Sequence, residues 1–567
     1  MKRVKKKLMS RIMAVCLMLV MVLSTGMAVS AVELTPGAKD SIKISGIETT
    51  DPEGYGIGTI NAYRVINVNV SDNNQPQAPV YTWDDAVADW VSRNFRSYID
   101  INNSNAVTDA FLDLSDQSDD EAQAELKTFV DRLANAIRSG ISVTPAYTID
   151  LSKRQPEGSE KAITEEVSLG AYLLLVEGGV RIYSPGFAGV YPETDQDGGW
   201  FTGSHTINVN LKSEEPGIDK TVSDYTYEIG QTVTYTLTVD VPDYPDNAID
   251  KKFIIADYLS SGLTLDPNSI KIYNYSDTAE DHKGEDITSR FTDYVFGTGE
   301  NDKHPSEATS PSFAKSFTGD YSILASQVIV EYNATVNENA VVMESEESEE
   351  TEETENGLDN KVYLIYNNNP YTDTGYREIP DEERVYTYGI EITKTGDGNT
   401  KLEGAEFTLN PVKGNLLEFV KDGGVYRPAL SGEENVTTTL VSDANGLITI
   451  KGLDLGTYIL TETKAPEGYE LPSDPTTTIE LIDEADPSTG KPDGILDNDV
   501  SKEYENTSNN DKDKMADGTI DKLVVNTKPG ILPSTGGIGT AVFTVCGILL
   551  MAGAVLLMVV VSRRKNR

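Results

Sequence analysis

A strict two-residue alternation of apolar and polar side chains constrains the fold of this 567-residue chain. Between positions 233 and 241 every odd place is apolar, and every even place holds threonine or aspartate. The pattern returns between positions 328 and 336. Because successive side chains of a strand point to opposite faces, this alternation predicts half-buried antiparallel strands. The predicted fold class is all-β, with tandem immunoglobulin-like β-sandwich domains.

The first third of the chain departs from this pattern through a helical insert. Apolar residues recur at helical spacing after Thr82 and again after Ser118, which forms a capping box with Glu121. The sequence therefore predicts two amphipathic helices that begin at these residues. An apolar helical stripe can bind a partner, but covering a sheet is its more common use, and we expect these helices to cover one.

Both ends of the chain carry segments for export and anchoring. A basic start, an apolar run from position 12 to about 23 and small residues up to Ala31 are typical of a signal peptide, residues 1–31. At the other end, an uncharged apolar run over 537–562 precedes a basic tail, which predicts a membrane-spanning helix with its C-terminus in the cytoplasm. An ordinary single-span membrane protein would share this second feature.

Composition excludes several kinds of function. The formal net charge is −44, so the chain would be repelled by nucleic acid. The two cysteines, Cys16 and Cys546, lie in the terminal apolar segments, so an exported mature chain would contain no disulfide. The fragment 195–198 lacks the rest of a calcium loop and predicts a turn. The three histidines are scattered, so we expect no metal, no cofactor and no turnover enzyme activity.

Two lysines occupy places where the strand pattern requires an apolar core residue. Lys220 shares a face with Ile218 and Val222, and Lys394 shares a face with Ile390 and Ile392. A buried lysine is costly unless it is neutralised or consumed. For one isolated case, a lysine that pairs with an acid or extends to the domain edge is the simpler interpretation.

Several motifs carry a resemblance to a known family. The C-terminal motif Leu532, Pro533, Ser534, Thr535 and Gly536, with the apolar run and basic tail, resembles the LPxTG sorting signal that sortases cleave between threonine and glycine. Residues 458–469 resemble the E-box of pilins, and 443–446 with 452–456 resemble the B-type repeat of collagen-binding adhesins. The chain resembles a sortase-assembled backbone pilin of Gram-positive bacteria, with A-type and B-type sandwich domains.

The resemblance implies self-catalysed isopeptide bonds between lysine and asparagine side chains. In the middle domain it implies a bond from Lys220 to Asn368, promoted by Asp257, with Asn367 as the alternative. In the C-terminal domain it implies a bond from Lys394 to Asn526, with Glu462 as the acid. Burial would leave the amine neutral and the acid protonated, which suits attack on the amide and loss of ammonia.

The same resemblance implies a nucleophile for polymerisation. Pilins present an acceptor lysine at the end of the N-terminal domain, and Lys212 occupies that place without the usual tyrosine and proline before it. The competing interpretation of Lys212 is a solvated lysine in the linker between two domains. One head amine and one tail carboxyl per subunit would make a heterologous contact that cannot close, so the product would be a filament.

The predicted organisation is a signal peptide over 1–31, an N-terminal pilin domain over 32–213, a middle domain over 214–385, a C-terminal domain over 386–530 and a sorting signal over 531–567. The predicted function is a structural shaft subunit of a wall-anchored pilus, with sortases, copies of itself, minor pilins and peptidoglycan as partners. A wall-anchored adhesin or tip pilin is the alternative, because it would share the signal and the sandwich domains. A wall-bound enzyme would need a nucleophile or metal-ligand spacing that the sequence lacks.

Overall fold

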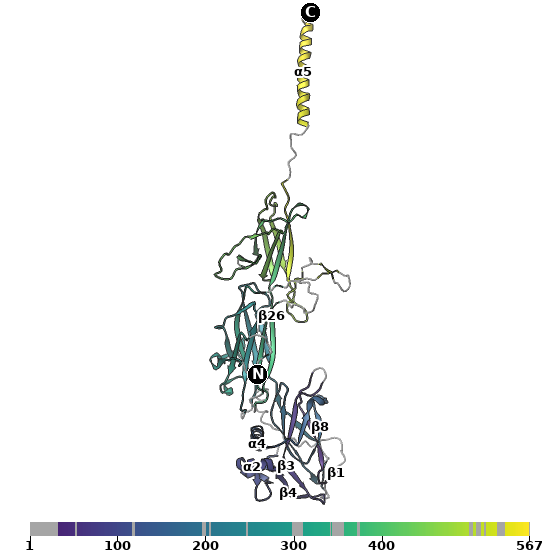
Figure 1. The fold of residues 1–567 in the computed structure, drawn as a ribbon, viewed down its shortest axis with the longest axis vertical. Coiled ribbons are helices and arrows are strands. Elements are labelled where there is room, and N and C mark those ends of the chain that lie inside the picture. The colour runs from purple at the N-terminus through teal and green to yellow at the C-terminus, as the bar shows by residue number, and fades with distance from the viewer. Residues whose placement is uncertain are drawn as a thin grey trace.

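The computed structural model describes residues 32–50, 54–115, 119–194, 200–202, 206–244, 248–297, 305, 310–340, 342, 357–370, 375–414, 416–497, 503–505, 512–514, 518–529 and 539–565. The predicted signal peptide, the turn at 195–198 and the sorting motif at 532–536 lie outside these residues. Three strand-rich blocks lie end to end, and one long helix extends beyond the last (Figure 1). The all-β fold class with a helical insert is confirmed.

The N-terminal block is built on a seven-stranded sheet of order β11-β9-β3-β4-β6-β5, with β7 paired to β3. A smaller sheet has the order β14-β2-β8, with β14 parallel to β2. The strands of the block are β1 (Val32–Glu33), β2 (Lys39–Ser45), β3 (Thr59–Val70), β4 (Pro76–Trp83), β5 (Ile99–Asp100), β6 (Ala106–Val107), β7 (Tyr147–Asp150), β8 (Ile163–Ser168), β9 (Gly170–Glu177), β10 (Ile182–Tyr183), β11 (Gly186–Val190), β12 (Glu193–Thr194), β13 (Trp200–Thr202), β14 (Ile207–Asn210) and β15 (Ser213–Glu214).

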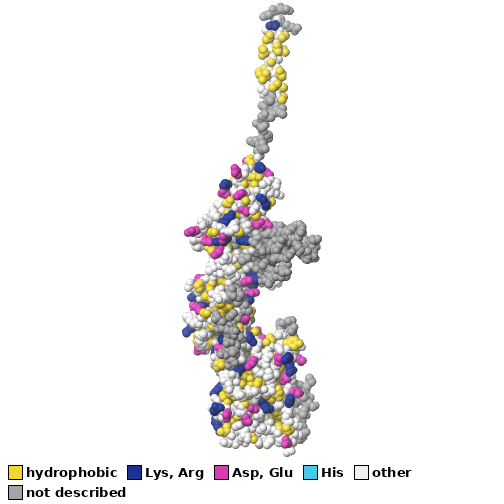
Figure 2. Space-filling model, viewed as in Figure 1, with side chains coloured by type: hydrophobic (Ala, Val, Ile, Leu, Met, Phe, Trp, Pro, Cys, Tyr) yellow, Lys and Arg dark blue, Asp and Glu magenta, His cyan; other side chains and the backbone are white. Residues whose placement is uncertain are grey.

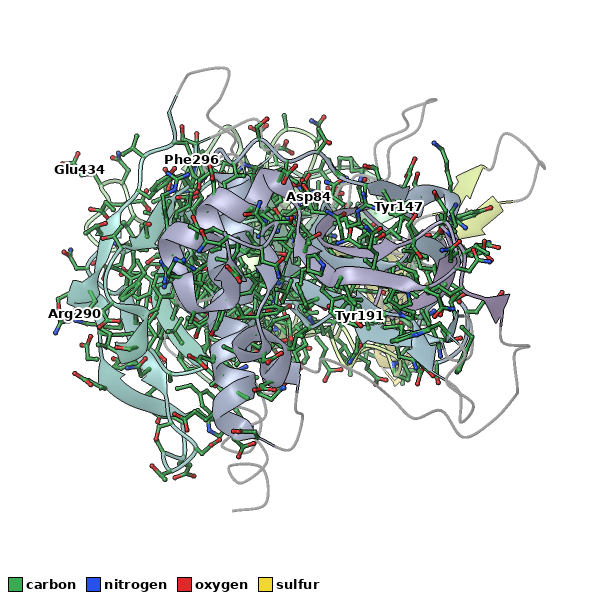
Figure 3. All side chains as sticks on the ribbon, turned by 90° about the horizontal axis from the view of Figure 1, so that it is seen from below. Asp84, Tyr147, Tyr191, Arg290, Phe296 and Glu434 are labelled. Carbon is green, nitrogen blue, oxygen red and sulfur yellow. The ribbon has the colours of Figure 1, made fainter. Side chains whose placement is uncertain are left out.

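Helices α2 (Asp85–Asn94), α3 (Asp109–Leu112) and α4 (Asp120–Arg138) form the insert, on one side of the strands in the view from below (Figure 3). Their apolar faces pack on the large sheet, where Trp83 and Phe129 meet ring to ring. The side chains of Asp84 and Asp119 accept hydrogen bonds from the first-turn amides. The expected cap Thr82 is therefore wrong, and Ser118 lies outside the described residues.

The middle block is a sandwich of two antiparallel sheets, with orders β16-β17-β24-β20-β21 and β22-β23-β18-β25-β26, and with β19 paired to β24. Their inward side chains form one core. Its strands are β16 (Ile218–Val222), β17 (Thr232–Asp240), β18 (Phe253–Leu259), β19 (Leu263–Leu265), β20 (Lys271–Tyr275), β21 (Lys283–Asp286), β22 (Phe291–Asp293), β23 (Phe313–Phe317), β24 (Gln327–Val336), β25 (Leu358–Tyr366) and β26 (Arg377–Val385).

The C-terminal block is a second, smaller sandwich with orders β29-β30-β32-β27-β37 and β31-β28-β33-β34. Its first strand β27 pairs in parallel with its last strand β37. The strands are β27 (Tyr388–Thr395), β28 (Glu406–Pro411), β29 (Phe419–Asp422), β30 (Val425–Pro428), β31 (Leu440–Val441), β32 (Leu447–Leu453), β33 (Gly456–Lys464), β34 (Thr476–Leu481), β35 (Glu503–Glu505), β36 (Lys512–Lys514) and β37 (Thr519–Val525), of which β35 and β36 form a separate pair.

Helix α5 (Gly539–Lys565) follows the last block. Its surface is almost wholly apolar, whereas acidic and basic side chains are scattered over the blocks (Figure 2). Its segment Val542–Arg563 is long and apolar enough to cross a membrane.

Candidate crosslinking sites

Lys220 lies in the core of the middle block, as the strand pattern predicted. Its side chain is fully buried between the two sheets, and its Nζ lies 2.8 Å from Asp257 Oδ2. The same Nζ donates a hydrogen bond of 2.6 Å to Oδ1 of Asn360. Because β16 is the first strand of the block and β25 is one of its last, this contact joins chain segments 140 residues apart.

Two tyrosines complete the middle site. Tyr332 donates a hydrogen bond of 2.8 Å to Asp257 Oδ2, and its hydroxyl oxygen accepts one of 2.7 Å from Asn360 Nδ2. The ring of Tyr332 stacks on that of Tyr235, with ring centres 5.4 Å apart, and the two centres lie 5.8 and 5.2 Å from Lys220 Nζ. All these side chains are inaccessible to solvent, so the site excludes water from the amine.

The asparagine expected at this site is wrong. Asn368 does not reach Lys220, because its Nδ2 donates to the carbonyl of Gly179 in the N-terminal block. The alternative, Asn367, donates to Asp250 Oδ2 at 2.8 Å. In the antiparallel pair of β18 and β25, Asp257 lies opposite Val362. Asn368 follows Val362 by six places, a separation of roughly 20 Å for an extended chain. Asn360 is two places before Val362 and opposite Leu259, so it lies diagonally across from the acid, on the same face of the sheet.

In the C-terminal block the structure brings together the three residues expected from the sequence. Lys394 on β27 donates a hydrogen bond through Nζ to Oδ1 of Asn526, which follows β37. Asn526 Nδ2 donates to Glu462 Oε1 at 2.8 Å, and Lys394 Nζ lies 3.6 Å from Glu462 Oε2. All three residues are buried, with at most 2% of their surface exposed. The parallel pairing sets Lys394 opposite Val524, two residues before the asparagine.

Burial shifts the protonation of both pairs in the same sense. Desolvation lowers the pKa of Lys220 and of Lys394, although the neighbouring acid partly opposes this. Desolvation raises the pKa of Asp257 and of Glu462, again against the effect of the lysine. Both shifts move each site toward a neutral amine beside a protonated carboxyl, the pair that nucleophilic attack on an amide requires.

Lys212, the expected acceptor for polymerisation, lies between β14 and β15 and is partly exposed. Its carbonyl accepts a hydrogen bond of 3.0 Å from the amide of Ser184. The pairing of β10 with β15 holds this segment against the N-terminal block. Its proposed partner Thr535 lies outside the described residues. Among the described residues, no group of three His, Cys, Asp or Glu side chains could hold a metal ion.

Asn360 and Tyr332 lie in the middle site but were not predicted from the sequence, which carries only a weak signal for either. Asn360 shares the inward face of β25 with Val362, Leu364 and Tyr366, so parity alone admits it but does not select it. Tyr332 falls in an apolar alternation and is indistinguishable from a core residue in the sequence.

Comparisons with known proteins agree with this architecture. Residues 388–489 match the SpaA family, described as a prealbumin-like fold domain, and residues 524–566 match the LPXTG cell wall anchor motif. The motif marks the chain as a sortase substrate, and with α5 it indicates a cell-wall-anchored surface protein.

The chain is 26% identical over 417 residues to the trypsin-resistant surface T6 protein of Streptococcus pyogenes serotype M6, covering 62% of this chain and 70% of that protein. It is 26% identical over 398 residues to fimbrial subunit type 1 of Actinomyces viscosus, covering 64% and 67%. Its fold is similar to the three-domain T6 backbone pilin of S. pyogenes serotype M6, with TM-score 0.52, 19% identity and coverage of 88% and 100%. Together, the anchor motif, the prealbumin-like domain and the two relatives support a likeness of this chain to sortase-assembled major pilins.

Proposed function

We propose that the chain is the shaft subunit of a covalently polymerised pilus, and that each subunit is reinforced by two internal lysine–asparagine bonds. The observation that carries the second part is the pair of buried clusters, each with an amine, a carboxyl and a carboxamide in mutual contact. In each, the lysine nitrogen would form a bond to the asparagine Cγ, and the amide nitrogen would leave as ammonia.

The bonds in question are Lys220 to Asn360 and Lys394 to Asn526. The bond would join the first strand to the penultimate strand in the middle block, and the first strand to the residue after the last strand in the C-terminal block. Tension along the fibre would then pass through covalent links. We infer that Asp257 and Glu462 promote them, since burial favours the protonated acid in both sites.

Polymerisation would use Lys212 and the sorting motif. A sortase would break the Thr535–Gly536 bond and hold the Thr535 acyl group as a thioester. The amine of Lys212 on another subunit would then form an amide with Thr535 and release the enzyme thiol. Partial exposure of Lys212 supports this role, because an intermolecular nucleophile must be reached. Minor pilins and a housekeeping sortase that transfers the filament to peptidoglycan would complete the assembly.

Intact mass of the purified, exported chain tests the internal bonds. We expect a mass lower than that of the linear chain by two molecules of ammonia, and lower by only one in Lys220→Ala and in Lys394→Ala. A wild-type mass equal to that of the linear chain would refute both bonds.

Wall extracts test polymerisation separately. Lys212→Arg keeps the charge but removes the nucleophile, so we expect the high-mass ladder to collapse to wall-linked monomer with the internal bonds intact. Lys153→Arg, whose side chain is 79% exposed on the same block, is the matched control and should retain the ladder. A ladder that persists in Lys212→Arg would assign the acceptor role to another lysine.

A further inference from the structure

The two candidate crosslinking sites connect their acid to the amide in different ways. In the C-terminal block, Glu462 Oε1 accepts directly from the nitrogen of Asn526. In the middle block, the nitrogen of Asn360 donates instead to the hydroxyl of Tyr332, and this hydroxyl donates to Asp257. In the middle site the tyrosine hydroxyl thus lies between the acid and the nitrogen that would leave, whereas in the C-terminal site the acid contacts that nitrogen directly.

The hydrogen bonds of Asp257 show that the acid does not reach the amide itself. Its Oδ2 receives both Lys220 Nζ and the Tyr332 hydroxyl, each at 2.8 Å. Its Oδ1 has no hydrogen-bond partner among the described residues. The described contacts therefore form one chain, from the amine through Oδ2 and the tyrosine oxygen to Asn360 Nδ2.

We propose that Tyr332 is a catalytic residue of the middle crosslink and delivers the proton that the amide nitrogen needs to leave as ammonia. This inference rests on the proposed function, because it assumes that Lys220 and Asn360 react. It assigns to Tyr332 a role that the C-terminal site performs with its carboxyl alone.

The step balances without any outside reactant. Lys220 Nζ forms a bond to Asn360 Cγ, and the nitrogen of the tetrahedral centre becomes pyramidal and basic. Asp257 takes one proton from Nζ and returns one to the oxygen of Tyr332, which passes its own proton to Nδ2. The Cγ–Nδ2 bond then breaks and ammonia departs. Asp257 and Tyr332 finish in the protonation states in which they began, and one proton has moved from Nζ to the leaving group.

The surroundings of Tyr332 suit a proton donor. Burial, reinforced by the adjacent Asp257, raises the pKa of Tyr332 well above its usual value, so the hydroxyl starts the reaction protonated and gives up its proton only as Asp257 returns one. Its ring is fixed between Tyr235, which stacks on it, and Phe313, which meets it edge-on with ring centres 5.0 Å apart. A fixed ring holds the hydroxyl within reach of both partners, as proton transfer requires.

The test compares both bonds within one molecule. The full chain is made by pulse-labelled cell-free synthesis, quenched at intervals and digested, and the crosslinked peptides are quantified by mass spectrometry. In Tyr332→Phe we expect the Lys220–Asn360 peptide to form about 100-fold more slowly or not at all, as expected for loss of a general acid. The Lys394–Asn526 peptide should form at the wild-type rate.

A matched variant separates chemistry from stability. Tyr244→Phe removes another buried hydroxyl from the same core, one that contacts Lys252 and Asn367 rather than the site. It should form both peptides at the wild-type rate. Near-UV circular dichroism of Tyr332→Phe should match that of Tyr244→Phe and so show a folded middle block.

The outcomes are distinct. A wild-type rate in Tyr332→Phe overturns the role of Tyr332 and leaves the crosslink itself standing. Equal slowing in Tyr332→Phe and Tyr244→Phe, or a middle block that is unfolded only in Tyr332→Phe, also overturns it, because stability would then explain the loss. Absence of the Lys220–Asn360 peptide from the wild type overturns the crosslink, and with it the premise.

Discussion

Lys491 of the C-terminal block reaches back to Glu383 of the middle block, and its Nζ lies 2.8 and 2.6 Å from the two carboxylate oxygens. Glu383 lies on β26 directly opposite Asn360, and only 6% of its side chain is exposed. The ion pair therefore ties the last block to the strand that covers the middle crosslinking site.

Removing this ion pair should loosen the joint between the two blocks. Lys491→Ala leaves a buried carboxylate without its cation, at a cost of about 1 to 2 kcal/mol. We expect the amides of Tyr227 and Tyr386, which bond across the joint, to exchange hydrogen about 10-fold faster. Lys464→Ala removes an exposed ion pair with Glu406 and is the control. Unchanged exchange in Lys491→Ala would mean that backbone contacts alone hold the joint.

The two asparagines proposed for the middle crosslink are separable by mutation. Asn360→Ala should raise the mass of the mature chain by one unreleased ammonia, after allowance for the substitution, whereas Asn368→Ala should leave the crosslink intact. Loss of a link over 140 residues should lower the free energy of unfolding of the middle block by about 5 kcal/mol on loop entropy. Thermal unfolding of both variants checks the energy. Retention of the bond in Asn360→Ala would exclude this residue as the partner of Lys220.

The acid of the C-terminal site should control its bond. In Glu462→Ala we expect Lys394 and Asn526 to remain unjoined, because Asn526 loses the carboxyl that its nitrogen contacts. The block should then be cut faster by protease. Peptide mapping checks the bond, and Glu470→Ala, an exposed acid outside the cluster, is the control. If Glu462→Ala still releases ammonia, another group must polarise the amide.

A pH effect is expected at the cleft between the middle and C-terminal blocks. Burial, with repulsion from Asp454, raises the pKa of Glu228 to about 7. When the pKa of an acid is higher in the folded than in the unfolded protein, the protein loses stability as pH rises between the two values. For Glu228 these values are about 4.5 and about 7. We expect the free energy of unfolding of the wild type to fall across this window by about 1 to 2 kcal/mol after discounting for partial exposure, and the unfolding midpoint to fall with it.

Glu228→Gln should flatten that dependence, because the substitution removes the ionising group and keeps its shape. Glu418→Gln, an exposed acid that lines the same cleft, should retain the wild-type slope. The midpoint measured by scanning calorimetry at several pH values decides between them. Equal slopes in wild type and Glu228→Gln would assign the pH dependence elsewhere.

How far the sequence predicts this molecule depends on the physical signal at each residue. Two-residue alternation predicts the strands and places Lys220 and Lys394 inward, because a half-buried strand imposes that period. The same parity admits both Asn360 and Asn368, and only the pairing of β18 with β25 shows that Asn360 lies diagonally across from Asp257. Tyr332 carries no local signal, because its role arises from partners on two other strands. Helix α2 begins later than expected because Asp84, rather than Thr82, caps its first turn.

The parallel pairing of β27 with β37 determines how the C-terminal block resists stretching. Tension would enter at the start of β27 and leave at the end of β37, which lie at opposite ends of the pair. Neighbouring strands loaded in this way are pulled past each other, so without the proposed Lys394–Asn526 bond the ladder from Gly389 to Thr395 would bear the load in shear and its hydrogen bonds would have to fail together. If tension entered one strand and left through an antiparallel neighbour at the same end of the pair, the hydrogen bonds between them would instead break one at a time.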